Sequence, residues 1–219
     1  MKIGTDGVLL GAWTSVVHQP FSVLDIGSGT GILSLMLAQR SDAELIDAIE
    51  IDAKAYEQCV ENFEQSLWGD RLFCYHASLE EFTNEIEDKY DLIISNPPFY
   101  SEDYKTENTP RDLARFTDAM PFEHVLDSVS KLLSENGLFS VVIPYKEESN
   151  FKSLALAAGL FPKRILNVKG TPKSEFKRSL IEFTRIQCVV KMETLIIETS
   201  RHQYTEAYIS LTNDFYLKM

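Results

Sequence analysis

From residue 21 to residue 159, hydrophobic residues follow two alternating patterns. Short apolar runs of strand length alternate with stretches in which apolar residues recur at helical intervals. The runs that predict strands are residues 21–29, 44–52, 71–78, 90–96 and 138–144. The stretches that predict helices are residues 32–40, 53–68, 79–86, 122–137 and 150–159. This alternation is typical of an α/β protein with a parallel, doubly wound sheet and helices on both faces.

Glycine and polar residues indicate where some elements end. Gly137 and Gly159 each close a helical stretch, and glycine at that position is a common helix stop. The first residues, 1–13 (MKIGTDGVLLGAW), predict a Gly-rich turn. Residues 101–121 predict a polar loop, and loops of that length in a compact domain are usually functional or disordered.

The pattern changes after residue 160. The runs 161–170, 177–186 and 192–199 predict three strands with no long helix between them. We therefore expect an antiparallel portion at the C-terminal side of the sheet. A terminal helix is predicted over residues 205–218, with Thr205 as its cap. Because no repeat, linker or low-complexity tract interrupts the chain, we expect one domain over residues 1–219.

Charge is divided unevenly along the chain. The 219 residues are 44% hydrophobic, enough for one well-formed core, and the net charge of −12 argues at first sight against a nucleic-acid partner. However, residues 42–91 hold 15 acidic and 3 basic residues, whereas residues 163–191 hold 8 basic and 2 acidic residues. The basic second half leaves two interpretations open, a scattered solvated surface or an RNA-facing patch.

The cysteines, histidines and apolar runs bear on three questions: the cellular compartment, a metal site and a membrane helix. Cys59, Cys74 and Cys188 share no ligand spacing, and we interpret each as a reduced thiol filling the core of a cytoplasmic protein. The four histidines also lack metal spacing, so no metal is expected. No apolar run approaches the roughly 20 residues of a membrane helix, and the N-terminus does not resemble a signal peptide.

The segment VLDIGSGTG, residues 23–31, carries the first chemical signal. Its three glycines follow a predicted strand and open a helix, where they permit a tight turn and close approach of a ligand. Asp25 just before the turn suits a cationic amino group and disfavours a pyrophosphate. Glu50 ends the next strand, where an acid binds ribose hydroxyls. Together they predict an adenosine ligand that carries an amino acid, S-adenosylmethionine.

The segment LIISNPPFYS, residues 92–101, carries the second signal. Two consecutive prolines end a buried strand, because neither can donate to a sheet ladder. Asn96 and the carbonyl of Pro97 offer two acceptors for the hydrogens of an exocyclic amino group, and Phe99 offers a flat wall for a base. Held in this way, the nitrogen lone pair points at a methyl donor. The segment predicts methyl transfer to a planar amino nitrogen, catalysed mainly by positioning.

In this order, VLDIGSGTG, IEID and NPPF resemble the seven-stranded, S-adenosylmethionine-dependent methyltransferases that act on planar amino nitrogens. A closer resemblance, which covers essentially the whole chain, is to the bacterial tRNA1(Val) adenine N6-methyltransferases. It is carried by the segments MKIGTDGVLLGAW, LIISNPPFY and YTEAYISLTNDFYLKM. The resemblance implies a Rossmann-like sheet of seven strands with an antiparallel C-terminal portion and an extra C-terminal strand and helix. It implies N6 methylation of adenine in the anticodon loop of tRNA by a cytoplasmic monomer that binds neither membrane nor metal.

The resemblance also assigns residues to the site. The methionine part of S-adenosylmethionine is assigned to Asp25, Gly27, Gly29 and Gly31, the ribose to Glu50 and the adenine to Ile51. The pocket near the cofactor carboxylate is assigned to Gly4, Thr5 and Asp6. The catalytic positions that hold the target adenine are Asn96, Pro97, Pro98 and Phe99, and Asn96 is assigned to cofactor binding as well. From charge and position we expect RNA contacts from Tyr100, Arg111, Arg115, Lys173, Lys177 and Arg178.

The chain departs from the family pattern at two places. Ser78 stands where the family often has an acid that binds the adenine amine, which implies weaker cofactor binding. Relatives also carry a basic, aromatic leader ahead of KIGTDG that is expected to help hold tRNA. The leader is expected to be absent here, which predicts poor tRNA binding.

Three alternatives stay open. The same amino-group chemistry would serve the N5 of a protein glutamine or the N2 of guanine in ribosomal RNA. A non-enzymatic alternative is a cofactor-binding but inactive RNA-binding subunit.

Overall fold

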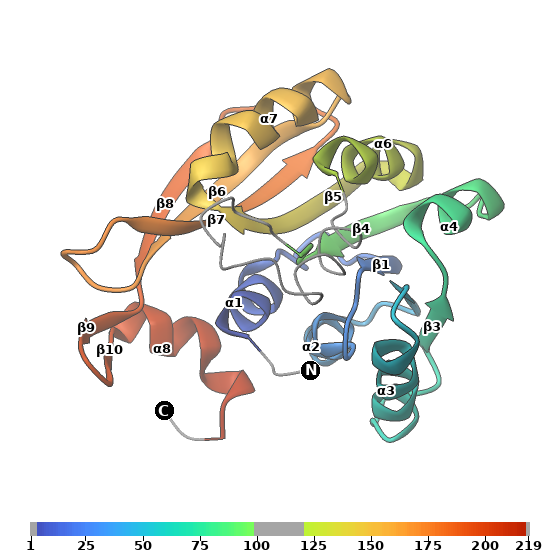
Figure 1. The fold of residues 1–219 in the computed structure, drawn as a ribbon, viewed down its shortest axis with the longest axis horizontal. Coiled ribbons are helices and arrows are strands. Elements are labelled where there is room, and N and C mark those ends of the chain that lie inside the picture. Colours follow the sequence, from blue (N-terminus) through green and yellow to red (C-terminus); the bar gives the residue numbers. More distant parts are fainter. Residues whose placement is uncertain (1–3, 99–120, 218–219) are drawn as a thin grey trace, which may run out of the picture.

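One sheet of eight strands forms the centre of the molecule (Figure 1). The computed structural model describes residues 4–98 and 121–217. The strand order is β3-β2-β1-β4-β5-β7-β6-β8, and β9 and β10 form a separate hairpin. The strands are β1 (Ser22–Ile26), β2 (Leu45–Glu50), β3 (Leu72–His76), β4 (Tyr90–Ser95), β5 (Leu133–Pro144), β6 (Phe161–Lys169), β7 (Phe176–Thr184), β8 (Lys191–Ile196), β9 (Glu198–Ser200) and β10 (Gln203–Tyr204).

The sheet is mostly parallel. Strands β1 to β5 pair with one another in parallel, whereas β7 runs antiparallel to both of its neighbours, β5 and β6. The predicted doubly wound sheet with an antiparallel C-terminal portion and an extra strand is therefore confirmed. The antiparallel portion is limited to β7, because the chain crosses over after β7 and adds β8 in parallel to the outer side of β6.

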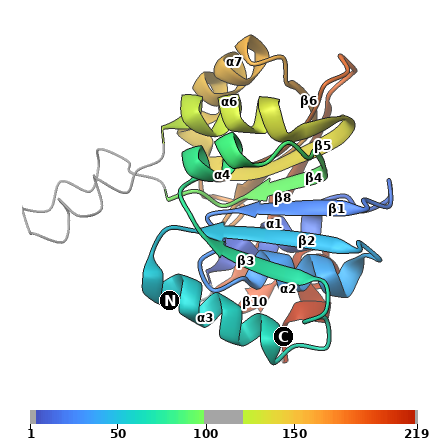
Figure 2. The ribbon, with the colours of Figure 1, turned by 90° about the vertical axis from the view of Figure 1, so that its right-hand side faces the viewer.

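Helices cover both faces of the sheet (Figure 2). α4, α6 and α7 lie on one face, and α1, α2, α3 and α8 lie on the other. The α-helices of the described residues are α1 (Thr5–Trp13), α2 (Ile32–Arg40), α3 (Ala53–Glu64), α4 (Leu79–Glu85), α6 (Phe122–Leu132), α7 (Glu148–Ala157) and α8 (Glu206–Thr212), with 3-10 turns at η2 (Tyr145–Glu147) and η3 (Asn213–Phe215).

Each face of the sheet has its own hydrophobic core, which explains why the strand segments are almost continuously apolar. Successive side chains of a strand point to opposite faces. On β1, Val23 belongs to the core under α1, α2 and α3, whereas Leu24 belongs to the core under α4, α6 and α7. On β4, Leu92 and Ile93 divide between the two cores in the same way.

The predicted Gly-rich turn at the N-terminus is wrong, because residues 5–13 form helix α1. This helix is buried almost all round. A Cβ on Gly11 would lie 2.6 Å from the Sδ of Met36 on α2. The glycine therefore allows α1 and α2 to approach closely and does not bend the chain.

The helix predicted over residues 122–137 also ends earlier than expected. α6 stops at Leu132, and Gly137 lies within β5. Leu133 is buried and pairs with Tyr90 of β4, while Leu138 pairs with Leu92, so a register irregularity absorbs the residues between them. Burial of Leu133 against the sheet outweighs the helical spacing of the segment.

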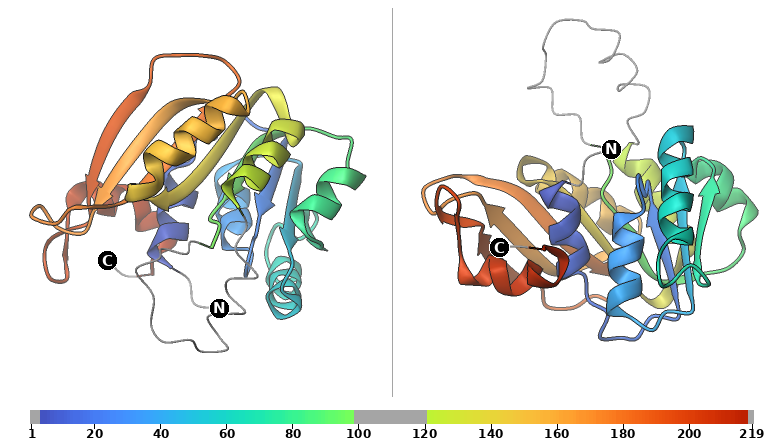
Figure 3. Two further views of the ribbon diagram at one scale, coloured as in Figure 1. Left: turned by 45° about the horizontal axis from the view of Figure 1, so that its top comes forward. Right: turned by 90° about the horizontal axis from the view of Figure 1, so that it is seen from below.

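The helix stop at Gly159 and the cap at Thr205 are confirmed, whereas the helices predicted over residues 53–68 and 205–218 end earlier, at Glu64 and Thr212. α7 ends at Ala157, and Gly159 just beyond it has a φ of +75°. The side chain of Thr205 accepts a hydrogen bond from the backbone of Tyr208 and caps α8, which lies beside α1 (Figure 3). The polar loop predicted over residues 101–121 lies, except for Pro121, outside the described residues.

The cysteines only partly match the prediction. All three thiols are free, and Cys59 is buried. Cys74 is half-buried and Cys188 is exposed, so the expectation that each fills the core is wrong for Cys188. Its segment follows β7 on the way to β8, where the chain leaves the sheet.

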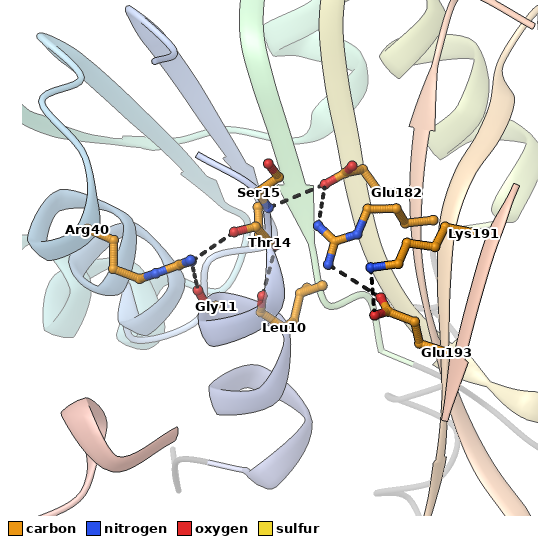
Figure 4. A network of polar contacts seen from close by, with 9 residues as sticks. Leu10, Gly11, Thr14, Ser15, Arg40, Glu182, Lys191 and Glu193 are labelled. Atoms are coloured by element: carbon orange, nitrogen blue, oxygen red, sulfur yellow. Dashed lines mark hydrogen bonds and ion pairs between the residues drawn. The ribbon is translucent and has the colours of Figure 1, made fainter. Parts of the chain in front are cut away.

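A polar network ties the end of α1 to the C-terminal strands (Figure 4). Glu182 of β7 is fully buried, accepts a hydrogen bond from the backbone of Ser15 at 3.3 Å and pairs with Arg164 of β6 at 3.7 Å. The guanidinium of Arg164 also lies 4.5 Å from the ring centroid of Trp13. On the solvent side, the Nη2 atom of Arg164 lies 3.8 Å from the Oε2 atom of Glu193. The network holds α1 against the sheet.

Candidate active site

The predicted Gly-rich turn joins β1 to α2 at the carboxyl edge of the sheet. Gly27, Gly29 and Gly31 all have positive φ, at +69°, +58° and +79°, a conformation that L side chains rarely adopt. The backbone N–H groups of Gly27 and Ser28 both donate to the carbonyl of Ile49, at 3.0 Å. These bonds fasten the turn to the end of β2.

Glu50 is the last residue of β2 and bridges two loops. One carboxylate oxygen accepts a hydrogen bond from the backbone of Gly29 at 2.7 Å, and the other accepts from the backbone of Asp52 at 2.9 Å. The side chain is 8% exposed, while the next residue, Ile51, is 63% exposed. Since each carboxylate oxygen has a further acceptor position, Glu50 can still bind two ligand hydroxyls.

Strand β4 brings the proline segment to the same edge. The hydroxyl of Ser95 donates to the carbonyl of Ile26 at 2.9 Å and so ties the end of β4 to the end of β1. Asn96 is half-buried, Pro97 is buried and Pro98 is exposed. The Nδ2 atom of Asn96 lies 3.7 Å from the position that a Cβ on Gly7 would take, so α1 closes over this amide.

These elements surround one cavity of about 740 Å³, within the usual range for a small-molecule site. Eight predicted site residues line it: Gly4, Gly27, Gly29, Glu50, Ile51, Ser78, Asn96 and Pro98. A carboxylate beside the glycine turn repels a phosphate and accepts hydroxyl or ammonium hydrogens. The cavity is therefore suited to a ligand with a sugar and a polar, non-phosphate group, placed next to the amide of Asn96.

Comparison with known proteins identifies the family. The model of the methyltransferase small domain matches residues 13–149. The chain is 63% identical over 220 residues to the tRNA1(Val) (adenine(37)-N6)-methyltransferase of Flavobacterium johnsoniae, a match that covers 100% of this chain and 94% of the relative. The protein of the same name from Bacteroides fragilis is 47% identical and is covered over 92% of its length. This chain belongs to the tRNA1(Val) (adenine(37)-N6)-methyltransferase family.

Solved structures agree on the fold. A predicted O-methyltransferase from Agrobacterium tumefaciens superposes with a TM-score of 0.69 at 19% identity, over 95% of this chain and 96% of that one. A ribosomal protein L11 methylase from Lactobacillus delbrueckii subsp. bulgaricus superposes with a TM-score of 0.58 at 18% identity, over 82% and 76% of the two chains. The α/β architecture is therefore the Rossmann-like methyltransferase fold.

Asp25 does not belong to the wall of the cavity. It is fully buried, and its Oδ2 atom accepts hydrogen bonds from the backbone and the hydroxyl of Ser34, at 3.2 and 2.8 Å. Its Oδ1 atom has no partner among the described residues. Burial raises the pKa of Asp25 to about 7, although the bonds from Ser34 act in the opposite direction. The contact with the methionine part that the family pattern assigns to Asp25 stays a prediction.

Five other assigned residues lie beside the cavity or in its wall in different roles. Thr5 and Asp6 open α1 but do not line the cavity, and Asp6 pairs with Arg178 at 2.7 Å. The lining residues here are Gly4, the cap of α1, and Gly7. Gly31 and Pro97 are buried behind the lining residues. Ser78 lines the cavity, but its hydroxyl accepts from the backbone N–H of Glu81 and donates to the Glu81 carboxylate, as the cap of α4.

The assigned RNA contacts fall into two groups. Phe99, Tyr100, Arg111 and Arg115 lie outside the described residues. Lys173, Lys177 and Arg178 lie between β6 and the first residues of β7, apart from the residues that line the cavity. Their roles stay predictions.

The sequence did not reveal the wall of the cavity made by α4 and α6. This wall is built by residues of two helices whose sequences look like ordinary solvated faces: Glu80, Thr83, Asn84, His124, Asp127, Ser128 and Lys131. His124, Asp127 and Lys131 are spaced by three and four residues, so they share one face of α6. That spacing is the only signal in the sequence, and it does not show what the face meets.

The structure shows two further properties of the described part of the chain. Within residues 4–98 and 121–217, no group of three or more His, Cys, Asp or Glu side chains is arranged to hold a metal ion. None of the helices in those ranges combines the length and the hydrophobicity needed to cross a bilayer.

Proposed function

We propose that this protein transfers the methyl group of S-adenosylmethionine to the N6 amino group of an adenine in tRNA. The observation that carries the proposal is that Glu50 and Asn96, from the ends of two different strands, line one cavity. The names of the relatives supply the tRNA and the N6 position. A tRNA substrate also agrees with the predicted cytoplasmic location.

The residues of the cavity suit this cofactor. Glu50 keeps acceptor positions for the two ribose hydroxyls, and the exposed Ile51 offers an apolar contact for the adenine ring. Gly27 is exposed towards the cavity, and a Cβ there would meet no described atom within 4 Å. A ligand can therefore approach the backbone of the turn closely.

Bound S-adenosylmethionine supplies an electrophilic methyl group, so the protein has to orient the acceptor nitrogen. In the proposed reaction, the carbonyl oxygen of Asn96 accepts one hydrogen of the target amino group, and the carbonyl oxygen of Pro97 accepts the other. Both prolines restrict the backbone at this point, because the ring of proline fixes φ. The tie from Ser95 to Ile26 holds this segment next to the glycine turn.

A labelled-methyl assay tests the proposal. The protein is incubated with S-adenosylmethionine labelled on its methyl group and, separately, with total tRNA, ribosomal RNA and protein from a strain that lacks the enzyme. We expect label in tRNA alone and, after digestion, in N6-methyladenosine. Label in glutamine or in N2-methylguanosine would replace the proposal with one of its alternatives.

Two variants relate the activity to the site. Asn96→Ala removes the side-chain acceptor, and we expect at least a hundredfold loss of kcat, about 2.7 kcal/mol of transition-state stabilisation. Asn150→Ala is the matched control, because Asn150 is exposed on α7, away from the cavity lining. Calorimetry should show that both variants still bind the cofactor. An Asn96→Ala enzyme with unchanged kcat would contradict the proposed role, and cofactor binding without transfer to any RNA would favour an inactive binding subunit.

A further inference from the structure

Two aromatic rings lie side by side at the carboxyl edge of the sheet, outside the cavity lining. Tyr145 directly follows β5 and is 40% exposed, and Phe176 is the first residue of β7. Their ring centroids are 5.0 Å apart with an interplanar angle of 36°. The Nζ atom of Lys169, the last residue of β6, lies 4.5 Å from the ring centroid of Phe176. Three neighbouring strands therefore contribute to one aromatic and basic surface.

The register of the sheet places this surface beside the proposed target site. β5 pairs in parallel with β4, and Val141 stands opposite Ser95. β5 continues for three residues beyond Val141 to Pro144, next to the point where residues 96–98 leave the end of β4. Tyr145 follows Pro144 at the next position. Since neighbouring strands lie about 4.8 Å apart, β7 with Phe176 is only about 10 Å from β4.

Basic and acidic residues both surround the two rings. Lys169, Lys173, Lys177 and Arg178 come from β6, β7 and the hairpin that joins them, which projects from the sheet at the left of Figure 1. The acidic residues of the same region are Asp6, Glu147, Glu148 and Glu175. Asp6 is paired with Arg178 at 2.7 Å, and the buried Glu148 is bound by Lys152 and Ser179 at 2.8 and 2.7 Å. Outside these two ion pairs, the named residues are three lysines, Lys169, Lys173 and Lys177, and two carboxylates, Glu147 and Glu175. The surface around the rings therefore keeps a small excess of positive charge for phosphate groups.

We propose that Tyr145 and Phe176 form a stacking site for a nucleobase that neighbours the target base in a single-stranded loop of RNA. Lys169 and Lys177 contact the adjoining phosphates. Single-stranded RNA is bound by aromatic rings on which bases stack, combined with basic side chains along the backbone. The inference rests on the proposed function, because it takes the target base to lie at Asn96.

The variants Tyr145→Ala and Phe176→Ala test the stacking site. The probe is a fluorescent stem-loop RNA with the anticodon sequence of a valine tRNA, and anisotropy measures its Kd. We expect each variant to raise Kd at least tenfold, equivalent to about 1.4 kcal/mol. Tyr145→Trp should retain wild-type affinity, because it keeps an aromatic face. The matched control is Phe73→Ala, which removes a 44% exposed ring on β3 and should change Kd less than twofold.

Abasic RNA shows whether the lost affinity belongs to a neighbouring base. In RNA whose nucleotide next to the target adenine lacks its base, the wild-type affinity should fall as much as it falls for Tyr145→Ala. Combining the variant with the abasic RNA should cause no further loss. Additive losses, or an unchanged Kd for Tyr145→Ala, would overturn the stacking site. Calorimetric titration with S-adenosylmethionine should give the same affinity for wild type and variants, which shows that the fold and the cavity are intact.

The two proposals fail in different ways. If the wild type binds the stem-loop RNA tightly but transfers no methyl group to it, the proposed function fails and the Kd comparison still decides on the stacking site. If the wild type methylates the RNA and the Tyr145→Ala enzyme has an unchanged KM, only the stacking site fails. If the wild type neither binds nor methylates RNA, both are refuted.

Discussion

Alanine at two glycines of the same turn should have different main effects. We expect Gly31→Ala to lose more stability and Gly27→Ala to lose more cofactor affinity. Gly27 and Gly31 both have a positive φ, +69° and +79°, so alanine is strained at either position. Their surroundings differ. A Cβ on Gly27 would meet no described atom within 4 Å, whereas a Cβ on Gly31 would lie 2.5 Å from Cε1 of Phe63 and 2.8 Å from Sγ of Cys59. Both of these neighbours are buried.

The magnitudes follow from these contacts. The left-handed conformation costs a residue with a Cβ roughly 1–2 kcal/mol. Overpacking a well-filled core by a methyl group costs typically about 1–3 kcal/mol more. We therefore expect Gly27→Ala to lower the free energy of unfolding by about 1–2 kcal/mol and Gly31→Ala by about 2–5 kcal/mol.

Cofactor affinity should fall more for Gly27→Ala than for Gly31→Ala. Gly27 lines the cavity, and Gly31 does not. A methyl group on Gly27 stands where the cofactor would approach the turn, so we expect at least a tenfold weaker Kd for S-adenosylmethionine, about 1.4 kcal/mol. Urea unfolding and calorimetry on the same preparations measure the two effects. Equal losses of stability, or weaker cofactor binding for Gly31→Ala than for Gly27→Ala, would refute the reasoning.

Three further predictions concern charged groups. Glu50→Gln replaces an acceptor of two backbone N–H groups with a side chain that accepts only one, so unfolding in urea should show a loss of roughly 1.5–3 kcal/mol. Burial raises the pKa of Asp25 to about 7, so the folded protein binds more protons than the unfolded chain between about pH 4 and pH 7, and its stability falls as the pH rises through this window. Urea unfolding from pH 5 to pH 8 should show that Asp25→Asn removes this contribution and is the more stable protein at pH 8; an unchanged slope would contradict the assignment. Arg164→Ala leaves the buried Glu182 without its cation and should cost about 3–5 kcal/mol in the same assay, whereas Lys191→Ala, which removes an exposed partner of Glu193, should cost at most about 1 kcal/mol.

Features that depend on local pattern could be predicted from the sequence. The alternation of apolar runs and amphipathic stretches is a direct consequence of a sheet buried on both faces, and it located β1 to β5 and most helices. Glu50 and Asn96 could be found because each ends a parallel strand, and such ends meet at one edge of a sheet. The glycine turn was found because only glycine adopts its three positive φ angles easily.

Features that depend on a partner elsewhere in the chain could not be predicted. Gly11 looks like a turn residue until Met36 is seen against it, and Leu133 looks helical until its burial against the sheet is known. The wall of the cavity on α4 and α6 was missed for the same reason. Residues such as Glu80 and His124 face the cavity only because the two helices pack on the same face of the sheet.

Helix α1 connects the cavity to the C-terminal strands through contacts at its two ends. Asp6 at its start pairs with Arg178, and Ser15 just after its end donates to Glu182. Both partners lie on β7, four residues apart, so they share one face and are about 14 Å apart along the strand. From Asp6 to Trp13 the helix rises by about 10.5 Å, and two non-helical residues then lead to Ser15. Leu180 lies midway between the two partners in the same hydrophobic core as α1.

These two contacts explain why the antiparallel strand matters for a cavity that it does not line. β7 holds α1 near both of its ends, and the start of α1 with its cap places Gly4 and Gly7 in the cavity wall beside Asn96. The contact at Glu182 is buried and belongs to the stability of the fold, whereas the contact between Asp6 and Arg178 is partly exposed. Loss of the buried contact should therefore lower the stability of the fold, and loss of the exposed one should only loosen the cavity wall next to the proposed target site.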